Sequence, residues 1–334
     1  MTNGTQKVKI NNTYSEEHPV LSGIPQGSLL GSVLFIIFIN DLPDVCINLS
    51  NMYLFADDAK IYKTVKSQTD SICQKKSYEN IVQWSDTWKM KLNADKCKVM
   101  TVINNSRNEI KYEYSSGVAE KPLEHVESMT DLGVVLDKCL NFKDHIYGKI
   151  NKAYQMLGLI RRNFMDLDVD SFIILYKSMV RSLLEFAVQV WCPFKKGLIE
   201  DIEKVQKRAT KMVKGFKSLP YTDRLKRLNL PTLKFRRIRG DMIEVFKILH
   251  GYYDENLVPT LNRNTDTRTR GNSMKLSHVR TNIDVRKYNF SVRVISIWNS
   301  LPHDVILVAS INSFKNKLDN FWIKEDVVYN WESD

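Results

Sequence analysis

The sequence lacks the cysteine patterns of a disulfide scaffold and of a zinc knuckle. Its five cysteines are scattered, odd in number and form no C-x-x-C pair. A disulfide framework needs an even number of cysteines, and a structural zinc site needs closely spaced pairs. The six histidines show no metal-ligand spacing either. We therefore expect a reduced, intracellular protein with neither a disulfide framework nor a structural zinc ion.

Long hydrophobic runs are also missing. The longest one, residues 33–39, is too short to span a bilayer, and the N-terminus lacks the apolar segment of a signal peptide. No glycine-rich P-loop and no nucleophile elbow occur. We therefore expect no membrane partner and no enzyme of the P-loop or serine-hydrolase kind. Because strand-like sequence begins almost at the first residue, we also expect the chain to be a piece of a longer protein.

Positive charge is what the sequence has in excess. The chain has 334 residues, 43% of them hydrophobic, and a formal net charge of +11. That length predicts one large domain or two to three modest ones. The isoelectric point, about 9.2, favours a polyanionic partner, nucleic acid first. Charge alone leaves open the alternative of a basic protein with no such partner.

Apolar periodicity and turn residues predict an α+β chain that changes character near residue 141. Before that point they predict a hairpin at 5–21, a buried helix at 29–39, strands at 53–56, 59–65, 98–103 and 131–136, and a helix at 69–90. After it they predict helices starting at 141 and covering 168–191, 198–216 and 232–250, a loop at 260–275 and a last compact unit at 286–322.

The most informative motif is the pair Asp57-Asp58 between two apolar runs, in Tyr53-Leu-Phe-Ala-Asp-Asp-Ala-Lys-Ile-Tyr62. The flanking residues predict a β-hairpin that holds both carboxylates at its tip. Phosphoryl transfer to a hydroxyl benefits from two divalent ions, and magnesium prefers carboxylate, phosphate and water oxygens. The doublet is therefore a candidate metal site. The alternative is an ordinary solvated turn, where aspartate is common.

A second motif, Ser22-Gly-Ile-Pro-Gln-Gly-Ser28, comes just before the predicted helix at 29–39. Its small residues allow a substrate to approach the backbone closely, and Gln26 offers an amide donor and acceptor to a base or sugar. The alternative is a simple loop in which Ser28 caps the helix.

Lysine and arginine gather in the helical half. Residues 200–250 contain 14 of them against 6 aspartates and glutamates, a net charge of +8. Five recur at three- and four-residue intervals, which predicts that most of them share one helix face: Lys204, Lys207, Arg208, Lys211 and Lys214. Such a face can follow the phosphates of a nucleic acid, although a solvated surface is the alternative.

Together these motifs resemble the reverse transcriptases of non-LTR, LINE-type retrotransposons of the jockey and CR1 kind. Ser22-Gly-Ile-Pro-Gln-Gly-Ser-Leu-Leu-Gly31 is similar to the family's motif B, and Phe55-Ala-Asp-Asp58 to its metal-binding motif C. Residues 91–100 resemble motif D, and Asp131-Leu-Gly-Val-Val135 resembles motif E, the primer grip. Shorter similarities, such as Trp298-Asn-Ser-Leu-Pro302, extend the resemblance over nearly the whole chain.

The resemblance implies roles for the residues that carry it. Asp57 and Asp58 would hold Mg²⁺ or Mn²⁺ as catalytic ligands. An RNA template, a DNA primer and deoxynucleoside triphosphates would be the partners. The remaining implied contacts are Gln26, Gly27, Ser28, Lys96 and Lys98 for substrate, and Leu132, Gly133 and Val134 for the primer. For the two lysines, an exposed charge without a substrate remains the alternative.

The resemblance also implies a domain order. We expect a partial polymerase palm at residues 1–140, made of an antiparallel sheet with helices. A helical thumb or connection region at 141–258, a linker at 259–285 and a small helical C-terminal unit at 286–334 would follow. Nuclear action is implied by the family alone, and nothing in the sequence indicates an oligomeric state.

Two departures from the family pattern bear on activity. Ser32 replaces the proline usual in motif B, which is a mild change. The family also takes a catalytic aspartate from motif A, upstream of motif B, yet the 21 residues before Ser22 contain no aspartate. We therefore expect a polymerase fragment that is inactive by itself. A non-catalytic nucleic-acid-binding remnant and a protein adopted for partner contacts stand as alternatives.

Overall fold

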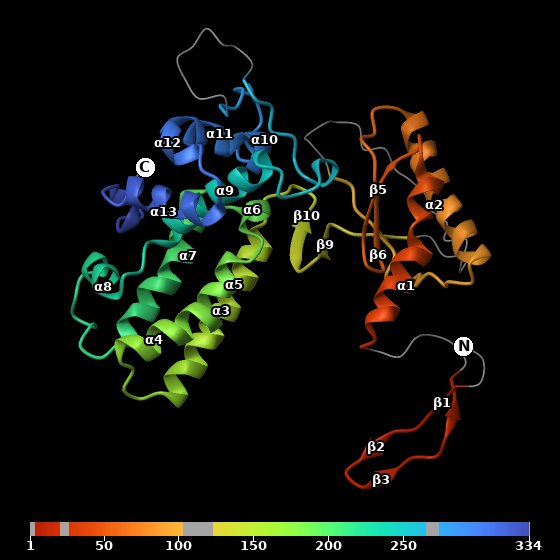
Figure 1. Ribbon diagram of the computed structural model, residues 1–334, viewed down its shortest axis with the longest axis horizontal. Helices are drawn as coiled ribbons and strands as arrows, with labels where there is room; N and C mark the ends of the chain where they lie inside the picture. The colour runs from red at the N-terminus through yellow and green to blue at the C-terminus, as the bar shows by residue number, and fades with distance from the viewer. Residues whose placement is uncertain (1–3, 21–26, 103–122, 265–273, 334) are drawn as a thin grey trace. The chain divides into compact units, whose positions relative to one another are not determined.

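The computed structural model describes residues 4–20, 27–102, 123–264 and 274–333 (Figure 1). The chain divides into two compact units. The first covers residues 1–99 and 105–126, and the second covers residues 100–104 and 127–334. These units do not follow the predicted ranges 1–140, 141–258, 259–285 and 286–334, whose functional meaning stays a prediction.

The first unit begins with the predicted hairpin. Strand β1 (Thr5–Gln6) pairs with β4 (His18–Pro19), and β2 (Lys9–Ile10) pairs with β3 (Thr13–Tyr14), all antiparallel. Asn11, at φ 53°, occupies the left-handed region in the turn. Asparagine tolerates that conformation better than most residues, which is why the sequence marked this turn.

The rest of the first unit packs helices against a second hairpin. Its elements are α1 (Leu29–Ile39), the 3₁₀ turn η1 (Leu42–Cys46), β5 (Asn51–Phe55), β6 (Asp58–Tyr62), α2 (Gln68–Thr87), and the short parallel pair β7 (Lys98–Val99) and β8 (Glu124–His125). Ser67 and Asp70 form a capping box at the start of α2. At its far end, the indole Nε1 of Trp84 donates to Asp41 over 3.0 Å.

The helix at 29–39 forms as predicted, but the prediction that it is buried is wrong. Ile39 is its only buried residue, and Leu29 is 89% exposed. The segment is apolar on every side, whereas only the side carrying Phe35 and Phe38 reaches the core around Trp84. A uniformly apolar sequence cannot indicate how many sides of a helix find partners.

The stretch Leu29–Cys46 also bears on the expected absence of a membrane partner. By length and composition alone, these 18 residues, of mean hydropathy 1.8, could cross a membrane. A single stretch of this kind is weak support, because core helices and signal sequences pass the same test. The expectation is therefore neither confirmed nor overturned.

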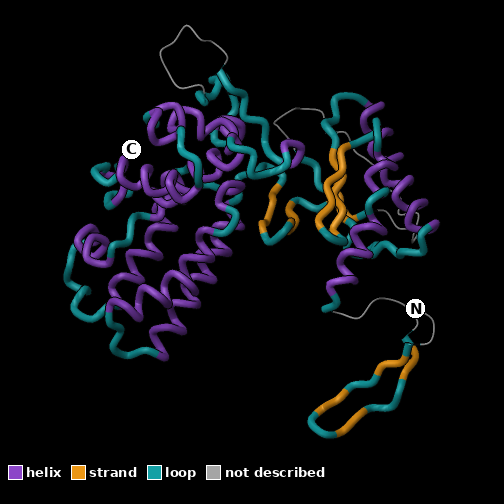
Figure 2. The backbone as a smooth tube through the Cα atoms, in the orientation of Figure 1, coloured by secondary structure: helices purple, strands orange, loops and turns teal. Residues whose placement is uncertain are grey.

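The second unit opens with the antiparallel hairpin β9 (Ser128–Asp131) and β10 (Val134–Asp137) and continues as helices (Figure 2). The helices are α3 (Lys143–Asn163), α4 (Val169–Leu175), the π-helical η2 (Tyr176–Arg181), α5 (Ser182–Glu185), α6 (Val188–Trp191), α7 (Lys196–Ala209), η3 (Thr210–Met212), α8 (Tyr221–Leu228), α9 (Leu233–Leu249), η4 (Glu255–Leu257), α10 (Asp284–Lys287), α11 (Phe290–Ser300), α12 (His303–Ile306), α13 (Ile311–Trp322) and η5 (Asp326–Val328).

Several predicted elements have different limits. Residues 131–136 are not one strand, because Leu132 and Gly133 form a turn between two strands. The strand predicted at 98–103 covers only Lys98–Val99 within the described residues. The helix predicted at 168–191 is divided by the π-helical turn η2 and by Ala187, whose φ is 53°. The loop predicted at 260–275 falls largely outside the described residues.

Two apolar cores hold the second unit. The first gathers α3, α4, η2 and α7 around Trp191, Tyr176 and Phe172. The second lies between α9, α11 and α13 around Trp298 and Phe314. Residues 286–334 therefore share a core with α9, and the predicted domain ranges stay a prediction. Helix α9 carries apolar residues toward both cores, such as Leu233 and Phe246.

Buried polar groups join α7 to its neighbours. The Tyr176 hydroxyl donates to Gln206 over 2.6 Å. The Glu203 carboxylate accepts from the Tyr221 hydroxyl at 2.5 Å and from the Leu233 backbone N–H at 3.0 Å. Burial raises the pKa of Glu203 in spite of these donors. These buried side chains of η2 and α7 thus have hydrogen-bond partners.

Candidate active site

The doublet Asp57-Asp58 lies at the tip of the β5–β6 hairpin, as predicted from the sequence. The two-residue turn is Ala56-Asp57, and Phe55 pairs with Asp58 across the ladder. Ala56 adopts φ 51°. An alanine in this left-handed region costs roughly 1–2 kcal/mol, so the rest of the hairpin must hold the turn in place.

Side chains that point alternately to the two faces of β5 and β6 provide that support. Met52, Leu54 and Ile61 pack on the core of the first unit. On the opposite, exposed face, the rings of Tyr53 and Tyr62 stack with centroids 5.4 Å apart. Both faces of the hairpin are therefore fixed by side-chain contacts, and the tip projects its carboxylates into solvent.

The donor set at the tip fits a hard divalent ion only in part. Both aspartates are exposed, and neither accepts a hydrogen bond or forms an ion pair within the described part of the chain. Magnesium is often held by one or two carboxylates with phosphate and water completing its shell. Among the described residues no group of three or more His, Cys, Asp or Glu side chains could hold a metal. The two carboxylates fit as part of such a site.

The motif before α1 is described only at its end. Gln26 lies outside the described residues. Gly27 adopts φ 85°, and a Cβ built on it would meet no atom within 4 Å. Ser28 occupies the N-cap position of α1, yet its side chain makes no capping bond. The hydroxyl of Ser28 is therefore not used to cap α1.

The two predicted substrate lysines differ in their surroundings. Lys98 begins β7, and its Nζ lies 3.2 Å from the Glu124 carboxylate. Lys96 is exposed in the turn before it. An exposed ion pair contributes little and breaks readily, so Glu124 does not prevent Lys98 from meeting a phosphate.

The predicted primer grip, Leu132, Gly133 and Val134, forms the turn of the β9–β10 hairpin. Leu132 (φ 44°) and Gly133 (φ 81°) both have positive φ, as a type I′ turn requires. Leu132 is 49% exposed, whereas Val134 is buried in the first helical core. The leucine is held in a conformation that its side chain disfavours, which is common at functional turns.

His145 on α3 is hydrogen-bonded to this hairpin and helps to hold it in place. Its Nδ1 accepts the Val135 backbone N–H over 3.1 Å, and its ring lies 5.3 Å from that of Trp191. Next to the hairpin, Asp137 accepts the backbone N–H groups of Asn141 and Phe142 and so secures the turn into α3. Because Nδ1 is an acceptor here, the imidazole must be neutral.

Changing Gly133 to alanine is expected to lower the free energy of unfolding by about 1–2 kcal/mol, because φ is positive there. The new Cβ would also meet the Phe186 ring at 3.3 Å. The matched control is Gly158→Ala on α3, where a Cβ meets nothing within 4 Å. That change should raise the stability by about 0.5–1 kcal/mol. Equal effects in urea titrations of the two variants would contradict the assigned turn.

Most of the five predicted phosphate-binding cations lie on one helix at a spacing that places them on one face, as predicted. Helix α7 ends at Ala209, so Lys211 lies in η3 and Lys214 beyond it, whereas the other three are on α7: Lys204, Lys207 and Arg208. The basic spacing in the sequence continues past the end of the helix, so it could not show that Lys211 and Lys214 lie outside α7.

Four of the five already contact other side chains. The contacts are Lys204 with Asp201 (3.0 Å), Lys214 with Asp166 (3.5 Å), Lys207 over the Trp331 ring (4.4 Å) and Arg208 over the Tyr154 ring (5.3 Å). Lys211 has no such contact within the described residues. A nucleic acid bound here would therefore meet Lys211 most freely.

Comparison with known proteins agrees with these observations. Residues 2–142, which include the β5–β6 and β9–β10 hairpins, match the family model "Reverse transcriptase (RNA-dependent DNA polymerase)". This part of the chain is thus similar to reverse transcriptases. No solved structure matches it.

The curated proteins that the chain resembles include polymerases from mobile elements. The chain is 26% identical over 289 residues to the RNA-directed DNA polymerase from mobile element jockey of Drosophila melanogaster, covering 80% of this chain and 30% of that protein. It is 25% identical over 222 residues to the probable RNA-directed DNA polymerase from transposon X-element of the same fly, covering 62% and 23%. The chain thus spans under a third of the length of these relatives, and the comparisons support a similarity to their polymerases at 25–26% identity.

Sequence reasoning missed two features of the second unit. Nothing in the sequence indicated a partner for His145, whose contact with Val135 depends on a turn inside the segment 131–136 that was predicted to be one strand. The ion pair of Asp241 with Arg293 joins residues 52 positions apart. No local pattern could reveal it.

Proposed function

We propose that the complete protein to which this chain belongs is an RNA-directed DNA polymerase of a non-LTR retrotransposon. The observation that carries the proposal is the strand–Asp57-Asp58–strand hairpin inside the segment that matches reverse transcriptases. The polymerase titles of the curated relatives support it. The substrates would be an RNA template, a DNA primer and deoxynucleoside triphosphates.

The chain's own residues would contribute positioning and charge. Asp57 and Asp58 would hold Mg²⁺ or Mn²⁺, which when bound stabilises negative charge on the reacting oxygens. Gly27 and Ser28, together with Gln26, would lie against template and nucleotide. Lys96 and Lys98 would lie near the triphosphate, and the Leu132–Val134 turn would contact the primer. Action in the nucleus is also part of this proposal and rests on the family alone.

We expect the chain by itself to extend primers poorly or not at all. Two-metal nucleotidyl transfer needs more acidic ligands than one doublet, no third acidic partner lies near the doublet among the described residues, and the 21 residues before Ser22 contain no aspartate. Extension of oligo(dT) on poly(rA), with Mg²⁺ or Mn²⁺, measures this.

Isosteric variants test whether any DNA synthesis that is detected depends on the carboxylates of Asp57 and Asp58. Asp57→Asn/Asp58→Asn removes both charges, and Asp86→Asn, at an exposed position on α2, is the matched control. Robust synthesis that the double variant abolishes and the control retains would refute the expected inactivity and show that the doublet suffices. Robust synthesis by the double variant would overturn the catalytic role of Asp57 and Asp58.

A second candidate function is nucleic-acid binding without catalysis. The net charge of +8 over residues 200–250 favours it, as does the lack of a third acidic ligand among the described residues. Tight, salt-dependent binding of the poly(rA)/oligo(dT) duplex without extension would select this function. Absence of both binding and extension would instead favour a protein adopted for partner contacts.

A further inference from the structure

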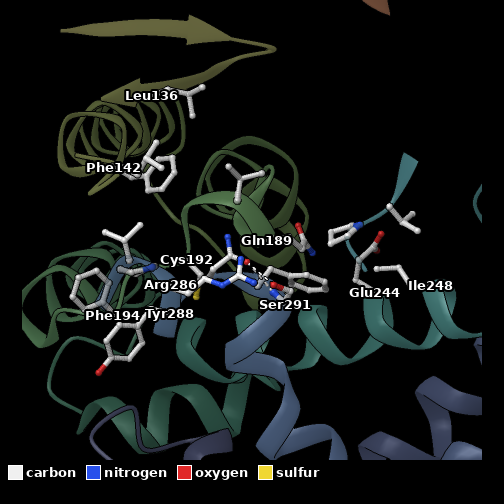
Figure 3. Close-up of a pocket in the computed structure, with 18 of the residues that line it drawn as sticks. Leu136, Phe142, Gln189, Cys192, Phe194, Glu244, Ile248, Arg286, Tyr288 and Ser291 are labelled. Atoms are coloured by element: carbon white, nitrogen blue, oxygen red, sulfur yellow. Dashed lines mark hydrogen bonds between the residues drawn. The ribbon is translucent and has the colours of Figure 1, made fainter. Parts of the chain in front are cut away.

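A large cavity in the second unit is lined by none of the residues assigned above to catalysis. Its volume is about 990 Å³, within the range of small-ligand sites. Five structural segments line it: the end of β10, the segment that runs from α6 into α7, α9, the η4 region, and α10 with the start of α11. Figure 3 shows Arg286 near its middle, with Phe194 and Tyr288 together at one end.

The aromatic end is built from a stacked pair. The rings of Phe194 and Tyr288 are 4.4 Å apart between centroids and inclined by only 5°. Both side chains are half-buried. Lys195 lies 5.9 Å from the Phe194 centroid, and Lys287 lies 5.3 Å from that of Tyr288. Stacking of a base on an aromatic ring is more favourable in free energy than an exposed lysine over the same ring. A base can therefore displace either ammonium group, which is then free to contact a phosphate.

Positive charge dominates this end of the cavity. Arg286 is exposed, and its guanidinium has no hydrogen bond or ion pair within the described residues. Cys192 also lines the cavity, and the charges of Arg293 and Arg237 oppose the rise that burial causes in the pKa of its thiol. Arg237 is only 4% exposed, and neither terminal amine has a hydrogen-bond partner among the described residues.

The two carboxylates of the cavity are already engaged. Glu244 lies at the opposite end in Figure 3, next to Ile248, and its Oε2 is 3.1 Å from Lys247. Asp254 accepts the Asn256 backbone N–H at 2.9 Å. Glu244 does not lie with the aromatic pair in Figure 3, whereas Lys195 and Lys287 do bring positive charge to the two rings.

We propose that this cavity binds an unpaired nucleotide of a single-stranded nucleic acid. The base stacks on the Phe194–Tyr288 pair, and Arg286, Lys195 and Lys287 take the flanking phosphates. Stacking platforms beside basic side chains bind single strands with little sequence preference, because every base has a π-face. The inference goes beyond the proposed polymerase and does not require that Asp57 and Asp58 support catalysis.

Binding of a fluorescein-labelled uridine 12-mer to the full chain tests the proposal. Phe194→Leu and Tyr288→Leu should each weaken binding on the order of tenfold, the expected loss of one stacked base. Arg286→Gln should weaken it and reduce the dependence on salt by about one phosphate contact. The matched controls Phe164→Leu and Arg161→Gln, at exposed positions at the end of α3, should bind like the unchanged chain.

Two further measurements make the outcome decisive. A 12-mer of the same charge without bases should bind at least tenfold more weakly, and a 5-iodouridine strand should crosslink to the peptide carrying Phe194 or Tyr288. A deoxythymidine 12-mer shows whether RNA or DNA is preferred, and tight binding of either strand supports the site. Equal binding of the base-free strand, or unchanged binding by both aromatic variants, would overturn it. Thermal unfolding of each variant verifies that it is folded.

Discussion

Replacing Arg293 with alanine is expected to lower the free energy of unfolding by about 3–5 kcal/mol. The Arg293 guanidinium meets Asp241 through two hydrogen bonds, Nε to Oδ2 at 2.9 Å and Nη2 to Oδ1 at 3.0 Å. Nη2 also donates to the Gln189 carbonyl at 3.0 Å, and Nη1 donates to the Tyr288 carbonyl at 3.1 Å. One side chain thus joins α6, α9 and the segment between α10 and α11.

The cost is large because Asp241 would remain buried without its partner. Asp241 is 5% exposed, and burial raises its pKa although the arginine opposes that rise. Removing one member of such a pair leaves an uncompensated charge, whereas replacing both with apolar residues of similar size is often neutral. We therefore expect Arg293→Met/Asp241→Leu to recover much of the stability that Arg293→Ala loses.

Chemical denaturation monitored by tryptophan fluorescence measures these differences. The matched control is Arg280→Ala, at an exposed position before α10. A loss below about 1 kcal/mol for Arg293→Ala, similar to that of the control, would mean that the pair is solvated and does not hold the helices together.

Acidification from pH 6.5 to pH 4 is expected to remove about 3 kcal/mol of stability through His145. Burial lowers the pKa of His145 from 6.5 to about 4, and the charges of Lys149 and Lys152 add to the effect. Between these two pH values His145 is protonated in the unfolded chain but stays neutral in the folded chain. Stability is therefore full above pH 6.5 and falls progressively as the pH approaches 4.

The same titration should loosen the β9–β10 hairpin, because a protonated imidazole cannot accept the Val135 N–H. His145→Asn keeps an acceptor near the Nδ1 position and cannot titrate, so it should be less stable at pH 7 but lose less stability on acidification. His303→Asn, exposed at the start of α12, is the matched control. Equal pH slopes for the unchanged chain and His145→Asn would contradict the assigned protonation.

Local patterns predicted the candidate site better than they predicted its surroundings. The Asp57-Asp58 hairpin was foreseeable because alternating residues and a turn-prone doublet lie within ten positions of one another. The turn at Leu132-Gly133 was missed because flanking apolar residues made a single strand equally consistent with the pattern. The basic residues around α7 were only partly foreseeable, since periodicity does not indicate where a helix stops or which lysines meet an aromatic ring.

The sequence by itself determined the similarity to reverse transcriptases, the acidic hairpin and the existence of most long helices, because each depends on residues close together in the chain. Tertiary structure alone decided which side of α1 is buried, that residues 286–334 share a core with α9, and that Phe194 stacks on Tyr288. These features join residues tens of positions apart. Their contacts depend on how helices pack, and hydrophobic packing is not directional enough to be read from local order.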